Sequence, residues 1–120
     1  MNAAELKKRV KQFAHRCVKL AITLPDTQLG KHIRGQLIRA ATSAAANYRA
    51  VCISQTKKSF IAKISIVIEE TDESNFWLEF IIDEKLILND EIFLLLKESA
   101  ELTSIFISSR KTAQNNIKAK

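Results

Sequence analysis

The chain has 120 residues, of which 47% are hydrophobic, and it contains only two glycines and one proline. This length corresponds to one domain with its own core, and the scarcity of helix breakers favours long helices over a sheet with many turns. The apolar content argues against disorder, and no apolar run reaches the ~20 residues of a membrane span. Because the first residues lack the apolar core of a signal peptide, we expect a cytoplasmic, all-α, single-domain protein.

The net charge of +6 is unevenly distributed along the chain. Residues 1–63 contain thirteen lysines and arginines and two acids, whereas residues 64–105 contain eleven acids and two bases. Two explanations are open. A basic pair of helices faces an acidic pair, within one subunit or between subunits, or the basic half forms a surface for a polyanion.

Apolar residues recur at steps of three and four in four segments, which is the pattern of helices that bury one face. The predicted helices span about 4–24, 29–52, 57–84 and 91–113, and a frayed basic tail follows at 114–120. Pro25 ends the first helix, and the later helices can be capped by Asp26 or Thr27, by Ser54 or Thr56, and by Asn89 or Asp90. Because the connections are short, we expect an up-down antiparallel four-helix bundle that assembles into a homo-oligomer.

The first helix carries a basic ridge opposite its apolar stripe. Its members are spaced by fours and are Lys7, Lys11, His15 and Lys19. Such a ridge is either a solvated face or part of a binding surface. The two cysteines, Cys17 and Cys52, lack metal-ligand spacing, and we expect both to be reduced and buried; a disulfide between helices is the alternative.

The second and third helices differ in bulk. The run from Ala40 to Ala46 contains five alanines, whose small side chains let a neighbouring helix approach closely. The third helix has large apolar residues, and its predicted core stripe includes Ile64, Ile68, Thr71, Asn75, Leu78 and Ile82. Its acids lead us to expect a polar network that fixes the register of this helix pair. The network comprises Arg39, Asn47, Glu69 and Glu73, with Arg39 bonded to Glu69 or Glu73.

The third helix is apolar on more than one face, because Phe76, Trp77 and Phe80 extend its stripe. Four helices cannot fully enclose one of their own, so these three aromatics are expected to form a subunit interface. The alternative is that Trp77 and Phe80 belong to the core of the single chain.

The sequence contains no catalytic constellation and no glycine-rich phosphate loop. Carboxylates inside four-helix bundles can hold two metal ions, but those sites use Glu-x-x-His pairs, and neither Glu69 nor Glu73 has a histidine three residues later. We therefore expect no metal, no cofactor and no enzymatic activity.

A motif across the second and third helices resembles a known family. Its first part is Arg39-Ala-x-x-Ser43-x-x-x-Asn47-Tyr48-Arg49-Ala50-x-Cys52. Its second part is Ser59-Phe60-Ile61-Ala62-Lys63-x-Ser65-x-Val67-x-Glu69-Glu70-x-Asp72-Glu73-Ser74-x-Phe76-Trp77-Leu78-Glu79. The pattern is similar to that of the 23S rRNA intervening-sequence proteins, small bacterial four-helix bundles, over roughly residues 5 to 110. Many members have Asn-Ile-Ala-Glu-Gly where this chain has Asn47-Tyr48-Arg49-Ala50-Val51, which indicates a different subgroup.

The resemblance implies a homopentamer of up-down bundles and a family without an established enzymatic activity. It extends more distantly to the accessory proteins of diversity-generating retroelements. Those proteins bind nucleic acid and a reverse transcriptase through a basic surface.

Two hypotheses from different classes follow. In the first, a homo-oligomer contacts RNA or DNA phosphates through Lys7, Lys8, Lys11, Lys19, Lys31, Arg34 and Arg49, with Arg110 and Lys111 as further bases. We expect no exposed aromatic side chains near these bases, which argues against sequence-specific stacking on single strands. In the second, the protein is an interaction scaffold whose bases serve only subunit pairing.

Overall fold

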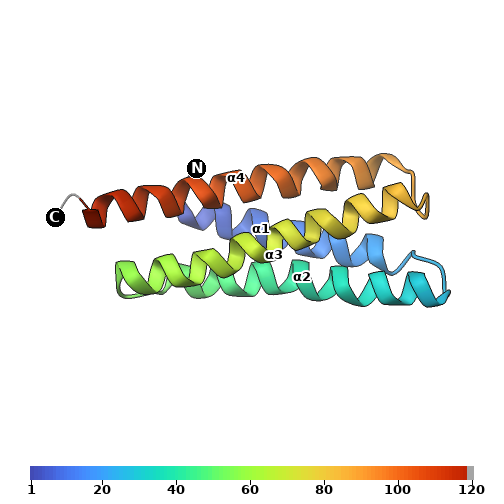
Figure 1. Cartoon of the computed structure of the whole chain (residues 1–120), viewed down its shortest axis with the longest axis horizontal. Helices are drawn as coiled ribbons and strands as arrows, with labels where there is room; N and C mark the ends of the chain where they lie inside the picture. The colour runs from blue at the N-terminus through green and yellow to red at the C-terminus, as the bar shows by residue number, and fades with distance from the viewer. Residues whose placement is uncertain (119–120) are drawn as a thin grey trace.

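Helices account for nearly the whole of this protein. A computed structural model describes residues 1–118, and within them the chain forms four helices and no strand. In chain order these are α1 (Ala3–Ala21), α2 (Gln28–Cys52), α3 (Lys57–Asp83) and α4 (Asp90–Lys118). They pack into one all-α domain of about 53 by 21 by 19 Å (Figure 1).

Each helix begins at a polar side chain that accepts a hydrogen bond from a free backbone N–H of the first turn. Asn2 accepts from the Glu5 amide at 2.8 Å, and the other three caps fall within the predicted pairs. Thr27 accepts from Gly30 at 3.0 Å, Thr56 from Ser59 at 3.1 Å and Asn89 from Ile92 at 3.0 Å.

Two helix ends differ from the predicted ones. The first helix ends at Ala21, not Leu24, because Pro25 restricts the backbone of the residue before it; Leu24 is nevertheless buried beyond the helix end. The fourth helix continues through residues 114–118, where a frayed tail was expected, because no glycine or proline interrupts it. The last two residues of that predicted tail lie outside the described part of the chain.

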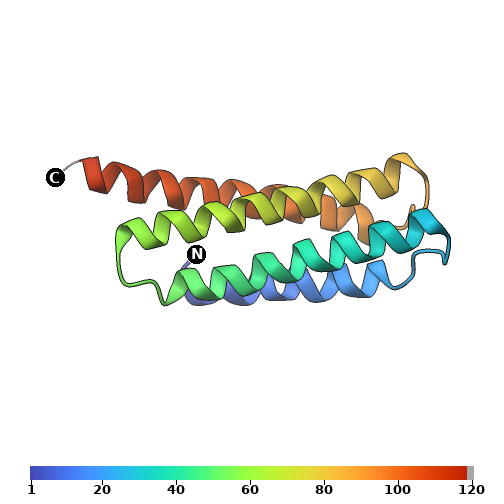
Figure 2. The same cartoon turned by 60° about the horizontal axis from the view of Figure 1, so that its bottom comes forward.

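The four helices run up and down, and each packs against its neighbours in sequence. Arg9 bonds to Glu98 while Arg16 bonds to Glu91, so a step forward along α1 matches a step backward along α4. Figures 1 and 2 show the α1–α2 and α3–α4 turns at one end of the bundle and the α2–α3 turn toward the other. The contact between α1 and α4 closes the ring and is the least extensive of the four.

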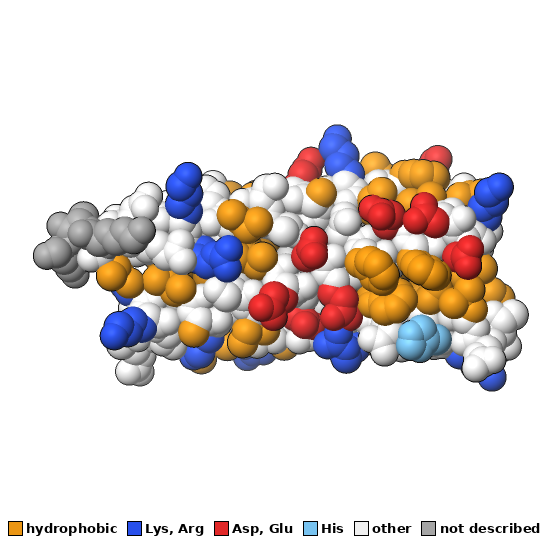
Figure 3. All heavy atoms as spheres, viewed as in Figure 1, with side chains coloured by type: hydrophobic (Ala, Val, Ile, Leu, Met, Phe, Trp, Pro, Cys, Tyr) orange, Lys and Arg blue, Asp and Glu red, His pale blue; other side chains and the backbone are white. Residues whose placement is uncertain are grey.

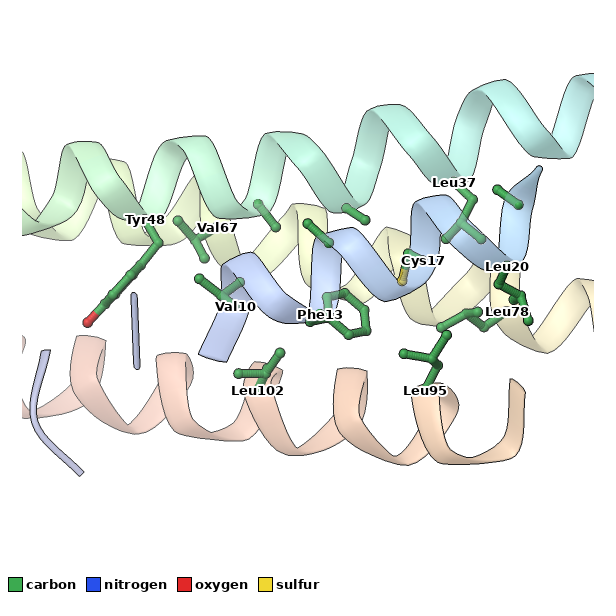
Figure 4. Close-up of a cluster of buried hydrophobic side chains, with 14 of the residues drawn as sticks. Val10, Phe13, Cys17, Leu20, Leu37, Tyr48, Val67, Leu78, Leu95 and Leu102 are labelled. Carbon is green, nitrogen blue, oxygen red and sulfur yellow. The ribbon is translucent and has the colours of Figure 1, made fainter. Parts of the chain in front are cut away.

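The core lies between the four helices and draws side chains from all of them (Figure 4). Phe13 of α1 is 1% exposed, and the close-up shows it among residues of the other helices. The labelled members include Val10 and Cys17 of α1, Leu37 and Tyr48 of α2, Val67 and Leu78 of α3, and Leu95 and Leu102 of α4.

The buried line of α3 is rotated relative to the predicted stripe. The predicted Ile68, Asn75 and Ile82 are only partly buried. Their places are taken by the preceding residues, Val67, Ser74 and Ile81, which are buried. The reason is that α3 packs against α2 on one side and α4 on the other, so its most buried line falls between the two contacts.

A line of small polar side chains joins α3 to α4. Asn75 donates to Ser99 Oγ at 2.8 Å, and Thr103 donates to Thr71 Oγ1 at 3.0 Å. Because a buried polar group needs its specific partner, these pairs favour one register of α3 against α4.

None of the helices within the described residues combines the length and the apolar character that crossing a lipid bilayer would need.

The central position of Phe13 leads to a stability prediction. Substituting Phe13→Ala should lower the free energy of unfolding by about 3–5 kcal/mol, because it removes a buried ring and leaves a cavity. Phe93→Ala is the matched control. Its ring is 49% exposed, so its effect should stay within about 0.5 kcal/mol. Denaturant unfolding followed by circular dichroism measures both, and equal losses would contradict this description of the core.

Candidate nucleic-acid interface

Three of the arginines form ion pairs between helices. Arg9 bonds to Glu98 and Glu101, and Arg16 bonds to Glu91 at 2.8 Å, so both tie α1 to α4. Arg39 ties α2 to α3, as described below. These pairs show that basic helices face acidic ones within a single subunit, as the first explanation of the charge distribution held.

Arg34 stabilises the α1–α2 turn. Its guanidinium donates to the Leu24 carbonyl at 2.7 Å and to Asp26 at 2.9 Å. The side chain is partly buried. Among the seven predicted nucleic-acid contacts, Arg34 is the residue that forms an ion pair within the described part of the chain.

Four of the predicted contacts meet in one groove between α1 and α2. Lys7, Lys8 and Lys11 come from the first half of α1, and Arg49 comes from the last turn of α2. The antiparallel packing brings these two segments side by side. The groove has a volume of about 600 Å³ and is completed by the small residues Ala4, Ala45 and Ala46.

The composition of the groove follows from the sequence. Alanines on α2 leave space where larger side chains would fill the surface between the helices. Lysine and arginine can lie along such an apolar surface with their methylene groups and still present their charges to solvent. All four cationic residues are exposed, and within residues 1–117 none of them forms an ion pair. Their charges are therefore available to an external anion.

The remaining predicted bases lie apart from the groove. Lys19 and Lys31 are exposed near the α1–α2 turn, at the opposite half of the bundle. Arg110 donates to Ser65 Oγ at 3.2 Å, which links it to the α3–α4 contact, and Lys111 is exposed on α4.

The predicted polar network keeps Arg39 and Glu73 but does not include Glu69 or Asn47. Arg39 bonds to Glu73 and, at 3.1 Å, to Glu70. Glu69 is exposed because the rotation of α3 turns it outward, and Glu70 takes its place beside α2. Asn47 does not join Arg39; its amide donates to the carbonyl and hydroxyl oxygens of Ser43, one turn earlier on the same helix.

The three predicted interface aromatics form a surface cluster with a histidine. Phe76 is 51% exposed, whereas Trp77 and Phe80 are partly buried against the core. The ring centroids of Phe76 and Trp77 are 4.9 Å apart, and those of His32 and Trp77 are 5.6 Å apart, both edge to face. We call Phe76, Trp77, Phe80 and His32 the aromatic patch.

The described residues contain no cluster of metal-ligating side chains, since no three His, Cys, Asp or Glu side chains within them are grouped to hold a metal ion. Cys17 is buried, and burial raises the pKa of its thiol well above the ordinary value. Cys52 is exposed, contrary to expectation, because it is the last residue of α2. Burial also raises the pKa of Tyr48 to about 12, so its hydroxyl stays protonated.

Two sets of contacts were not predicted from the sequence: the bonds of Arg9 and Arg16 to α4, and the contact of His32 with Trp77. The bonds from Arg9 and Arg16 to α4 depend on which face of α1 meets that helix. The place of His32 beside Trp77 depends on the register of α2 against α3. For the arginines, the available signal was their seven-residue spacing, which puts them on one face of a helix.

Comparison with known proteins gives a family and a structural relative. The model of the 23S rRNA-intervening sequence protein family matches residues 3–108. A crystal structure from Bacteroides thetaiotaomicron, described as a protein of unknown function from the S23 ribosomal protein family, superposes with a TM-score of 0.83. The two sequences are 30% identical, and the match covers 92% of this chain and 99% of that one. No protein with a curated function matches the sequence.

The Arg16–Glu91 pair gives a pH prediction. The bond from Arg16 holds the pKa of Glu91 below its ordinary value of 4.5. A carboxylate whose pKa is lowered by folding stabilises the protein above its unfolded-state pKa, and this contribution is lost as the pH falls through the folded-state pKa. Glu91→Gln should therefore be less stable than the parent at pH 7, with a difference that shrinks below about pH 4.5.

Thermal unfolding between pH 3 and 8 measures this difference. The control is Glu69→Gln, which removes an exposed carboxylate that forms no ion pair within the described residues. A difference for Glu91→Gln that is the same at every pH would contradict the assigned role of the pair.

Proposed function

This chain belongs to the 23S rRNA-intervening sequence protein family, and on that premise we propose that it is a non-enzymatic, self-associating protein that binds RNA or DNA through backbone phosphates. The observation that carries the proposal is the α1–α2 groove, where Lys7, Lys8, Lys11 and Arg49 converge and have no ion-pair partner among the described residues.

The groove suits a phosphate backbone better than a base. Its four cationic residues can each contact a phosphate oxygen and release the counterions condensed on the nucleic acid. None of the described residues that line the groove is aromatic, so they offer no surface on which unpaired bases could stack. Phosphate contacts fix position without reading sequence. Binding is therefore governed by the shape and charge of the nucleic acid.

Self-association is the second part of the proposal, and a homopentamer is the state that the family resemblance implies. A multimer would present several grooves to one nucleic acid, which raises the overall affinity through effective concentration. The exposed aromatic patch supports this part, because large apolar surfaces on a folded chain commonly mark an interaction site.

A second candidate function is an interaction scaffold whose partner is another protein, such as a reverse transcriptase. The observation that favours it is the same aromatic patch, which lies outside the cationic groove. In this case Arg49→Glu would break the oligomer and leave any weak binding to nucleic acid unaltered. Arg34→Glu would do the same, but it would also remove the bonds of Arg34 to Leu24 and Asp26 in the α1–α2 turn. Sizing the variants together with a binding assay distinguishes the two functions.

The test of nucleic-acid binding is a salt titration with a structured RNA. For the parent protein, log affinity should fall linearly with log salt, by about 0.9 for each duplex phosphate that is neutralised. The double variant Lys7→Glu/Lys11→Glu should bind on the order of tenfold more weakly at low salt and show a shallower slope.

The matched control is Lys57→Glu/Lys58→Glu, which makes the same change of charge at two exposed lysines in the first turn of α3. It should keep most of the affinity. If both variants lose affinity equally, net charge and not the groove determines binding. If the parent shows no complex even at low salt, the proposed function is wrong.

A further inference from the structure

We propose that the aromatic patch on α3 is a docking site for a second copy of this chain, which contributes the exposed end of its α1. The inference rests on the proposed self-association and adds to it the two surfaces that meet. It makes the contact head-to-tail, so that each copy uses the patch toward one neighbour and the end of α1 toward another.

The first surface is the outward face of α3. Phe76 is its exposed apolar centre, and Trp77 and Phe80 flank it with rings that the core only partly covers. Exposed acids continue the same face at helical spacing, with Asp72 one turn before Phe76 and Glu79 one turn after it. Figure 3 shows hydrophobic side chains on this half of the bundle with acidic side chains at their border. A partner for this surface must therefore be apolar at its centre and basic around it.

The chain itself carries a second surface with those properties. Ile22, at the end of α1, is 63% exposed, and Lys19 lies one turn before it on the same face. Lys31 is exposed near the start of α2, which follows the α1–α2 turn. Within the described residues neither lysine has an ion-pair partner. Apolar and basic groups on one copy thus complement apolar and acidic groups on another.

The two surfaces also lie at similar positions along the long axis of the bundle. The contact between His32 and Trp77 puts the aromatic patch level with the start of α2, and Ile22 lies just before that helix begins. Both surfaces are thus at the end of the bundle that carries the α1–α2 turn (Figure 2). Copies related by rotation about an axis parallel to the bundle can therefore match the two surfaces without sliding along that axis.

The test uses two variants that each remove one surface. Phe76→Lys puts a cation into the patch, and Lys19→Glu/Ile22→Ser removes the basic and apolar groups of the opposing end. All three side chains are exposed, so circular dichroism should show folded helices in both variants. In light scattering coupled to size exclusion, the parent should be a multiple of 13.6 kDa and each variant a monomer.

Mixing the two variants gives the decisive measurement. Each retains the surface that the other has lost, so a head-to-tail contact predicts a 1:1 complex of twice 13.6 kDa that grows no further. Ile53→Ser is the matched control, because Ile53 is 76% exposed but lies in the α2–α3 turn at the opposite end. It should leave the parent assembly unchanged.

Three results separate this inference from the proposed function. A multimeric parent whose Phe76→Lys variant keeps the same mass overturns the docking site and leaves self-association in place. A mixture that remains monomeric shows that the surfaces do not meet. A parent that is monomeric throughout contradicts self-association itself. The RNA titration with the groove variant Lys7→Glu/Lys11→Glu tests nucleic-acid binding independently of these three results.

Discussion

Pairing between arginines and carboxylates at the helix seams decides which charges of this protein remain for a partner. The α1–α4 contact is the least extensive of the bundle, and it is there that Arg9 and Arg16 meet glutamates. The planar guanidinium can bond a carboxylate through two N–H groups, as both arginines do, which a lysine ammonium does not reproduce. Such partly exposed pairs add little stability each. Their main effect is to orient the bundle and to leave the lysines of α1 unpaired.

The second constraint is that α3 carries apolar side chains on more of its circumference than α2 and α4 can cover. This helix packs between α2 and α4, and the inner line from Ile64 to Ile81 is fully covered by them. Its outward face carries Ile66 and Phe76, which are 43% and 51% exposed. A single four-helix layer has no further element to cover that face. The surplus of apolar surface and the surplus of cationic surface thus arise on different helices of the same small bundle.

The sequence was sufficient for the four helices and their order, because apolar spacing, one proline and capping side chains before three of the helices indicate where they lie. It did not predict the end of α1 at Ala21 or the continuation of α4 beyond residue 113. It was not sufficient for contacts that depend on rotation about a helix axis. One residue corresponds to about 100° of rotation, and this separates Glu70, which bonds Arg39, from the predicted Glu69. The basic ridge containing Lys7 and Lys11 could be predicted from the spacing of these residues. Its position beside Arg49 could not, because it depends on the register of α1 against α2.

The cationic groove and the aromatic patch lie at opposite halves of the bundle, and this separation has a functional consequence. A site that binds phosphate is most useful when it stays solvated and open, whereas a patch of aromatic side chains is stabilised by being covered. If both occupied the same half, assembly would take the lysines of the groove out of water, at a desolvation cost that only a well-placed acidic partner offsets. With Phe76 toward one end and Lys7 toward the other, the docking of a second copy and the binding of a polyanion that we propose would use different residues. In the assembly that we propose, each added copy would bring another groove to the same nucleic acid.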